Sequence, residues 1–65
     1  MNEYMLTAKT GRQLDIGMRL VYGRGIVCRG IPNKDETGRM YYMIIFTTTE
    51  EIYYQLKDQY EAFVR

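Results

Sequence analysis

The strongest strand signal in the chain is the segment RMYYMIIFT, residues 39–47. It is rich in tyrosine, isoleucine and phenylalanine, which favour extended structure. In a strand, alternate side chains point to opposite faces, so Tyr41, Met43 and Ile45 face one way and the residues between them face the other. Both faces are apolar, whereas a strand of a small antiparallel sheet normally has one polar face. We therefore expect a central strand with one face in the core and a second face that needs a cover.

Two kinds of cover are available for the second face of residues 39–47. The first is another part of the same chain, either the N-terminal strand or the C-terminal segment. A partner is the other, and we expect the partner to be a protein because tyrosine and methionine are enriched at the centres of interfaces. A second copy of the chain is an alternative use of the same surface, since a core built from only 65 residues is thin and would gain stability in a homodimer. The residues predicted to bind the partner are Tyr41, Met43, Ile45 and Tyr53.

Turn signals divide the rest of the chain into short segments. Thr10-Gly11 and Gly23-Arg24-Gly25 are predicted to be tight turns, and residues 32–38 form a polar loop with both proline and glycine. Short strands at this spacing predict an all-β domain, a small antiparallel barrel of about five strands. The predicted strands are residues 4–9, 12–16, 18–22, 26–31 and 39–47.

Residues 48–64 fit two descriptions. Read as a strand, residues 52–56 alternate and residues 57–63 make a short closing helical turn. Read as a helix, the segment begins with a capping box formed by Thr48 and Glu51. One face of that helix would then carry apolar residues at spacings of four, four and three, namely Ile52, Leu56, Tyr60 and Phe63.

A resemblance favours the strand and closing turn. Residues 17–27, GMRLVYGRGIV, place a glycine before an apolar strand, a glycine-rich turn and a returning strand. Residues 41–46 and 50–56 continue with an apolar strand, a polar turn and a further apolar segment. In this layout residues 17–64 resemble SH3-like and Tudor-like barrels, and in particular the RNA-polymerase-interacting domain shared by CarD-type regulators and transcription-repair coupling factors. The resemblance implies a five-stranded barrel that ends in a short helical turn; the alternative is an antiparallel sheet with a C-terminal helix packed across it.

The composition excludes most catalytic chemistry. The 65 residues allow one domain, residues 1–65, with no histidine and one cysteine. Without histidine, the chain lacks a side chain whose unperturbed pKa is near neutrality and lacks imidazole ligands for a metal. Cys28 lies in an apolar run and is expected to be a small buried residue. Adjacent carboxylates such as Glu50-Glu51 point to opposite faces of a strand or lie in solvated turns. We therefore expect no enzymatic activity, no metal and no cofactor.

The sequence also indicates a location. No segment approaches the roughly 20 apolar residues of a membrane span, and the N-terminus lacks the features of a signal peptide. A single unpaired cysteine is typical of a reducing compartment. We expect a soluble, cytoplasmic protein without a membrane partner.

Charge is unevenly distributed along the chain, although 9 basic and 8 acidic residues leave a net charge of only +1. Residues 9–34 hold six basic residues and one acidic residue, and residues 35–65 hold three basic and six acidic residues. The basic half is predicted to supply a charged rim that steers and orients the partner. The alternative is nucleic-acid binding by the same side chains, which would contact phosphates and stack on bases. The candidate residues are Arg19, Arg24, Arg29 and Tyr22.

Together these features predict a small non-catalytic binding module that acts through protein–protein contacts. A compact, near-neutral module of this size is typical of accessory or inhibitor proteins, such as phages and other mobile elements direct at a host nucleic-acid enzyme. The alternative is a nucleic-acid-binding protein that uses the arginine-rich N-terminal half.

Overall fold

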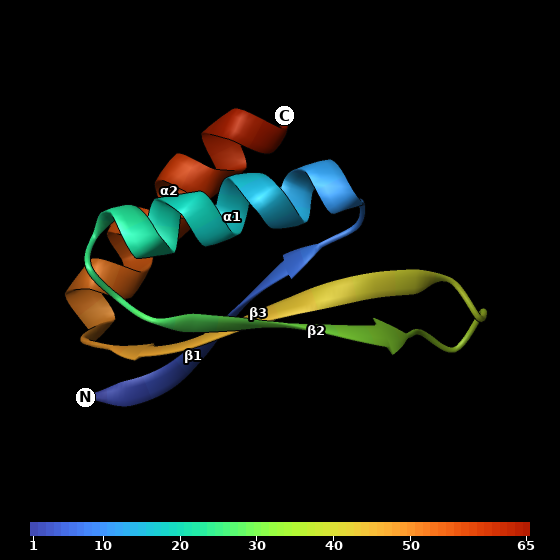
Figure 1. Cartoon of the computed structure of the whole chain (residues 1–65), viewed down its shortest axis with the longest axis horizontal. Coiled ribbons are helices and arrows are strands. Elements are labelled where there is room, and N and C mark those ends of the chain that lie inside the picture. The colour runs from blue at the N-terminus through green and yellow to red at the C-terminus, as the bar shows by residue number, and fades with distance from the viewer.

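Strand β3 (Met40–Thr48) is the centre of a three-stranded antiparallel sheet in the computed structural model, which describes residues 1–65. It pairs with β1 (Asn2–Ala8) on one side and with β2 (Cys28–Lys34) on the other. Helix α1 (Gly11–Gly23) connects β1 to β2, and helix α2 (Glu50–Val64) follows β3. Both helices lie on the same side of the sheet (Figure 1). The central strand that the sequence predicts is therefore present.

Helix α1 begins at a cap that the sequence encodes. The Thr10 hydroxyl accepts a hydrogen bond from the backbone N–H of Gln13 at 3.1 Å, and the Gln13 side-chain oxygen accepts one from the Lys9 N–H at 2.8 Å. These two bonds satisfy amide donors that the first turn leaves free. The helix ends before Gly25, which adopts φ 77°, a left-handed conformation that favours glycine. The Gly25 N–H donates to the Tyr22 carbonyl at 2.9 Å.

The strands predicted over residues 12–16 and 18–22 are wrong, because this stretch forms α1. Its inner face repeats every three or four residues, as an amphipathic helix requires. The turn expected at Gly23-Arg24-Gly25 ends this helix and does not join two strands. The residues that pack on the sheet side are Leu14, Gly17, Met18 and Val21.

Strands β2 and β3 form a hairpin that projects beyond the helices (Figure 1). The Asp35 carboxylate organises its loop by accepting hydrogen bonds from the Thr37 hydroxyl at 2.7 Å and from the N–H groups of Thr37 and Arg39 at 2.9 and 3.0 Å. The Thr37 hydroxyl, helped by these N–H groups, holds the pKa of Asp35 below its ordinary value. Because β2 continues to Lys34, the loop is shorter than the predicted residues 32–38.

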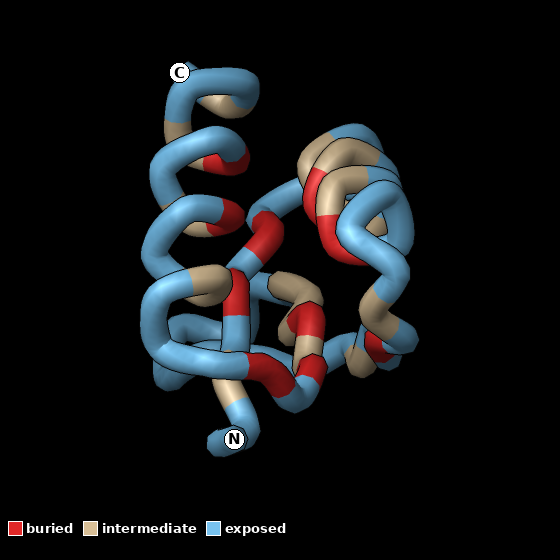
Figure 2. The backbone as a smooth tube through the Cα atoms, turned by 90° about the vertical axis from the view of Figure 1, so that its left-hand side faces the viewer, coloured by how far each residue is buried: buried red, intermediate tan, exposed pale blue.

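The strand and closing turn predicted for residues 48–64 are wrong, because the segment forms a single helix, the other description that the sequence allows. The helix begins one residue later than the predicted cap. The Thr49 hydroxyl accepts a hydrogen bond from the Ile52 N–H at 3.3 Å, while Thr48 is the buried last residue of β3. Figure 2 shows that the buried sides of both helices turn toward the sheet and toward each other.

The predicted all-β barrel of about five strands is also wrong. The protein is an α/β fold in which two helices cover one face of an open three-stranded sheet. A barrel requires the sheet to close on itself, whereas β1 and β2 are free edges here. The barrel implied by the resemblance to SH3-like and CarD-type domains fails for this reason. The alternative, a sheet with a C-terminal helix, includes α2 but omits α1.

The hydrophobic core is small and draws on all five elements. Tyr60 of α2 reaches across it and donates its hydroxyl to the Thr7 carbonyl of β1 at 2.9 Å. Cys28 is buried, as predicted, and burial raises the pKa of its thiol. The eight core residues are Leu6, Ala8, Val21, Cys28, Ile44, Phe46, Leu56 and Tyr60.

Candidate functional site

One face of the sheet carries the helices, and no element covers the other, which we call the open face (Figures 1 and 2). Side chains alternate along each strand, so the neighbours of core residues Leu6 and Ile44 point to the open face. The strand register then places these neighbours in rows across the three strands. Two of these rows are Met5–Ile45–Arg29 and Thr7–Met43–Ile31.

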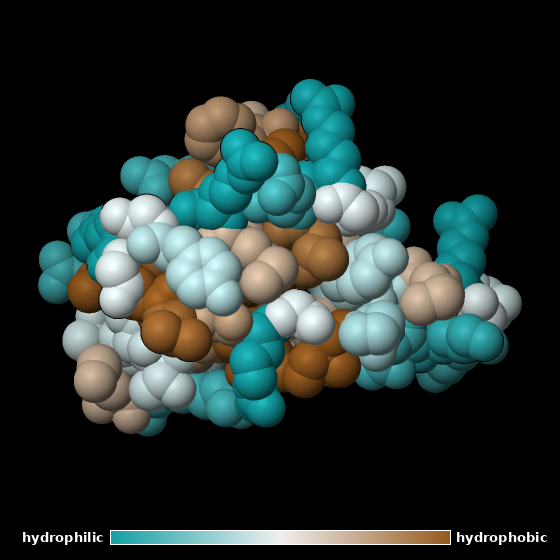
Figure 3. Space-filling model, in the orientation of Figure 1, coloured by the Kyte–Doolittle hydropathy of each residue, from teal (hydrophilic) through white to brown (hydrophobic).

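The middle of the open face is apolar. Met5 is 46% exposed, and the other apolar side chains are half-buried by their neighbours on the same face. The Asn33 side-chain amide donates to the Met43 sulfur at 3.8 Å, which places Asn33 beside this group. Figure 3 shows hydrophobic surface extending to the side of the molecule away from the helices. We call these residues the apolar patch: Met5, Ile31, Tyr41, Met43 and Ile45.

The structure brings together three of the four residues predicted to bind a partner. Tyr41, Met43 and Ile45 share the open face because they alternate along β3. Tyr53 lies on α2, on the covered side of the sheet. Its ring stacks on Tyr4 of β1, with ring centroids 4.2 Å apart and planes at 9°. Tyr53 therefore joins α2 to the sheet and lies outside the apolar patch.

The predicted charged rim is divided between two parts of the surface. Arg19 lies on the exposed side of α1 and forms an ion pair with Asp15 at 3.2 Å. Arg24 follows the end of α1 and donates to the Gln55 side chain of α2 at 2.9 Å. Arg29 is the one member of the set that lies on the open face, opposite Ile45. Arg24 and Arg29 both line the hollow near the turn between α1 and β2, whereas Arg19 lies apart from them.

Tyr22 is the fourth residue of the predicted basic surface. It is 52% exposed, and its hydroxyl donates to the Cys28 carbonyl at 3.2 Å. This bond ties the last turn of α1 to the start of β2. Tyr22 therefore stabilises the connection between α1 and β2. It does not belong to the apolar patch.

Strand β1 supplies open-face residues that the sequence analysis missed. Met5 and Thr7 stand beside β3, and two opposite charges, Glu3 and Lys9, flank them. The sequence contains the pattern that identifies them: Met5, Thr7 and Lys9 occupy every second position of residues 4–9, which are predicted to be extended, and Glu3 continues the alternation by one step. Side-chain alternation along β2 likewise places Ile31 on the open face.

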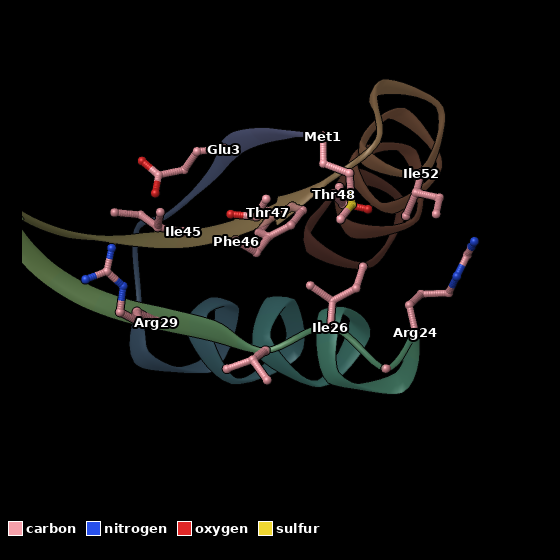
Figure 4. Close-up of a pocket in the computed structure, with 12 residues that line it drawn as sticks. Met1, Glu3, Arg24, Ile26, Arg29, Ile45, Phe46, Thr47, Thr48 and Ile52 are labelled. Carbon is pink, nitrogen blue, oxygen red and sulfur yellow. The ribbon is translucent and has the colours of Figure 1, made fainter.

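Two shallow hollows lie at opposite ends of the open face. The first, of about 630 Å³, is lined by Glu3, Ile45 and Arg29 among others. Figure 4 shows Ile45 between Glu3 on the β1 side and Arg29 on the β2 side. The second, of about 510 Å³, is lined by Lys9 and Tyr41 together with the hairpin loop. Small molecules are normally bound in deep cavities. Shallow open hollows of this kind fit the projecting side chains of a protein surface better.

No family model, curated protein or solved structure matches this chain. No group of three or more Asp, Glu, Cys or His side chains is placed to hold a metal ion. Neither helix is long and apolar enough to cross a membrane.

Proposed function

We propose that the protein is a non-catalytic binding module that contacts another protein chain through the apolar patch. The observation that supports this proposal is the position of the patch: five neighbouring apolar residues lie on a sheet face that no other part of the chain covers. Large apolar side chains on a surface gain free energy when a partner removes them from water. Tyr41 adds a hydroxyl that can hydrogen-bond at the edge of such a contact.

The arrangement of charge supports protein binding over the alternative of nucleic-acid binding. A nucleic-acid surface needs basic side chains gathered along the path of the phosphates. Arg19 instead lies away from the open face and pairs with Asp15, and Arg24, which shares a hollow with Arg29, already donates to Gln55. A host nucleic-acid enzyme as the partner stays a prediction from the size and charge of the chain.

Capture from a nuclease-treated cell lysate tests the proposal, using the tagged full chain and two variants. Met43→Lys places a charge in the middle of the apolar patch. Phe63→Lys is the matched control, because Phe63 is an apolar residue, 63% exposed, on α2. Burying an unpaired lysine in an interface costs several kcal/mol, so Met43→Lys should reduce capture at least about tenfold.

The expected result is a set of proteins that the wild type and Phe63→Lys retain and Met43→Lys loses. Circular dichroism of each variant checks that the fold is intact, and Met5→Lys provides a second open-face substitution if Met43→Lys unfolds. An untagged copy of the chain is added to the lysate, and equal capture of every protein, this copy included, by the wild type and both open-face variants would refute the proposal. Capture that occurs only in a parallel lysate without nuclease would replace it with the nucleic-acid alternative.

A further inference from the structure

We infer that the protein bound by the open face is a second copy of this chain, so that two open faces pack together in a symmetric dimer. The inference rests on the proposed function and names its partner. Three observations carry it: the opposite charges of Glu3 and Lys9 at the two ends of the open face, the central position of Ile45 and Met43 on that face, and the low net charge of the chain.

The charges on β1 complement those of a second copy. Glu3 lines the hollow at one end of the open face, and Lys9 lines the hollow at the other end. They are six residues apart, about 20 Å along an extended strand. A half-turn about an axis that lies in the interface and crosses the strands reverses the direction of β1. Glu3 of each copy then faces Lys9 of the other, and symmetry makes this pair twice.

The same rotation brings two apolar residues of β3 together at the centre of the face. The axis passes between the two rows of the open face, so Ile45 of one copy faces Met43 of the other. Arg29 faces Ile31 of the second copy. Arg29 is on the edge strand β2, so its aliphatic stem can pack on that isoleucine while its guanidinium stays in water. Arg29 is the one charged residue on these two rows, and its charge thus stays in contact with water.

The aligned arrangement agrees with the way sheets pack. Two sheets that pack face to face keep their strands within about 30° of each other, and long Glu and Lys side chains can span the resulting offset. The face measures roughly 14 Å by 23 Å from the usual strand spacing and rise. This is about 320 Å² per copy, or roughly 640 Å² for the pair, which is below the roughly 1,200 Å² of standard specific interfaces, so we expect weak association with a dissociation constant of about 100 μM.

The chain as a whole also favours self-association. Its net charge of +1 produces little repulsion between copies. Its core contains eight buried apolar residues, and burial of a second apolar layer would stabilise each copy by mass action.

Sedimentation equilibrium of the purified full chain tests the inference with charge reversals. Glu3→Lys and Lys9→Glu each turn both Glu3–Lys9 pairs into repulsions and should weaken dimerisation about tenfold. An equimolar mixture of the two variants restores both pairs in a heterodimer, because each variant then presents the charge that the other lacks. Asp58→Lys and Lys34→Glu are controls with the same charge changes at exposed positions away from the open face.

The expected result is a wild-type dimer at hundreds of micromolar, an about tenfold higher dissociation constant for Glu3→Lys and for Lys9→Glu, a heterodimer in their mixture, and unaffected controls. A wild type that is monomeric at about 1 mM overturns the inference, as does a mixture that fails to associate. If the wild type is monomeric but the lysate experiment still shows capture that depends on Met43, the proposed function stands and its partner is a different protein. A dimer that persists in Met43→Lys uses another surface and overturns the inference, whereas the proposed function is still decided by the lysate experiment.

Discussion

Gly17 lies where α1 crosses the sheet and meets α2. A Cβ atom at this position would collide with Ile44 Cδ1 and would lie 3.1 Å from the Tyr60 ring. A glycine inside a helix costs about 1 kcal/mol relative to alanine, so this residue weakens α1 taken alone. The close approach of the helix to β3 offsets that cost, because it completes the packing around the core.

Replacement of Gly17 by alanine should therefore destabilise the protein, in spite of the higher helix propensity of alanine. We expect a loss of about 1–3 kcal/mol in the free energy of unfolding, because Ile44 and Tyr60 must shift to admit the methyl group. Urea denaturation followed by circular dichroism measures this loss. Gly11→Ala is the control, since nothing lies within 4 Å of a Cβ at Gly11, and it should be neutral or stabilising by less than about 1 kcal/mol. Equal effects of the two substitutions would contradict the close packing.

At the scale of single elements, α1 illustrates how a helix can be mistaken for strands. Glycines at 17 and 23 and the apolar run between them are typical of strands and turns when they are read locally. Thr10 and Gln13, three residues apart, are the typical start of a helix, and Leu14, Met18 and Val21 follow at helical spacing. The information for α1 was thus present in the sequence, but the glycines obscured it. Gly17 is explained by its contact with β3 and α2, which the local sequence does not show, whereas nothing lies within 4 Å of a Cβ at Gly23, in the last turn.

The cap of α1 is expected to contribute measurably to stability, because a 13-residue helix is marginal without support. Thr10→Ala removes the acceptor for the Gln13 N–H and should cost about 1 kcal/mol. Thr10→Asn retains a side-chain acceptor and should stay close to the wild type. Urea denaturation of both variants makes the comparison. Equal destabilisation by alanine and asparagine would show that the cap is not the reason Thr10 matters.

At the scale of the whole molecule, the contacts between β1 and α2 decide how the two ends of the chain come together. The Tyr60–Thr7 hydrogen bond joins residues 53 positions apart, and the Tyr4–Tyr53 stack supports the same interface. Both contacts lie on the covered face. They keep α2 on the same side of the sheet as α1 and so leave the open face free.

The Tyr60 contact predicts how stability depends on pH. Burial raises the pKa of Tyr60 above 10.0 in the folded state, so at alkaline pH the unfolded chain loses this proton first. The unfolded state then binds fewer protons, and stability falls as pH rises above about 10. Tyr60→Phe should cost about 1 kcal/mol at pH 7 through the lost hydrogen bond, and its difference from the wild type should narrow at higher pH. Urea unfolding between about pH 7 and pH 11 tests this, and a constant difference would contradict it.

The candidate site was predictable where it depends on one strand. Tyr41, Met43 and Ile45 share a face because side chains alternate along any extended segment, and the apolar character of both faces of residues 39–47 is visible in the sequence. Tyr53 could not be placed in this way, because its position depends on whether residues 48–64 are strand or helix. Arg19, Arg24 and Arg29 are near one another in sequence, but α1 places Arg19 apart from the other two, which line one hollow.

The sequence by itself determined the central strand, the small core with a buried Cys28, and an excess of apolar surface for a chain of this size. Only the tertiary structure decided that the second face of β3 is open, since either helix could have packed there on the basis of its own amphipathic pattern. Long-range contacts place both helices on one side of the sheet, and the residues that make them are Gly17, Tyr53 and Tyr60. Periodicity is a local property and shows which side of an element is apolar, whereas the choice between the two faces of a sheet depends on residues far apart in the chain.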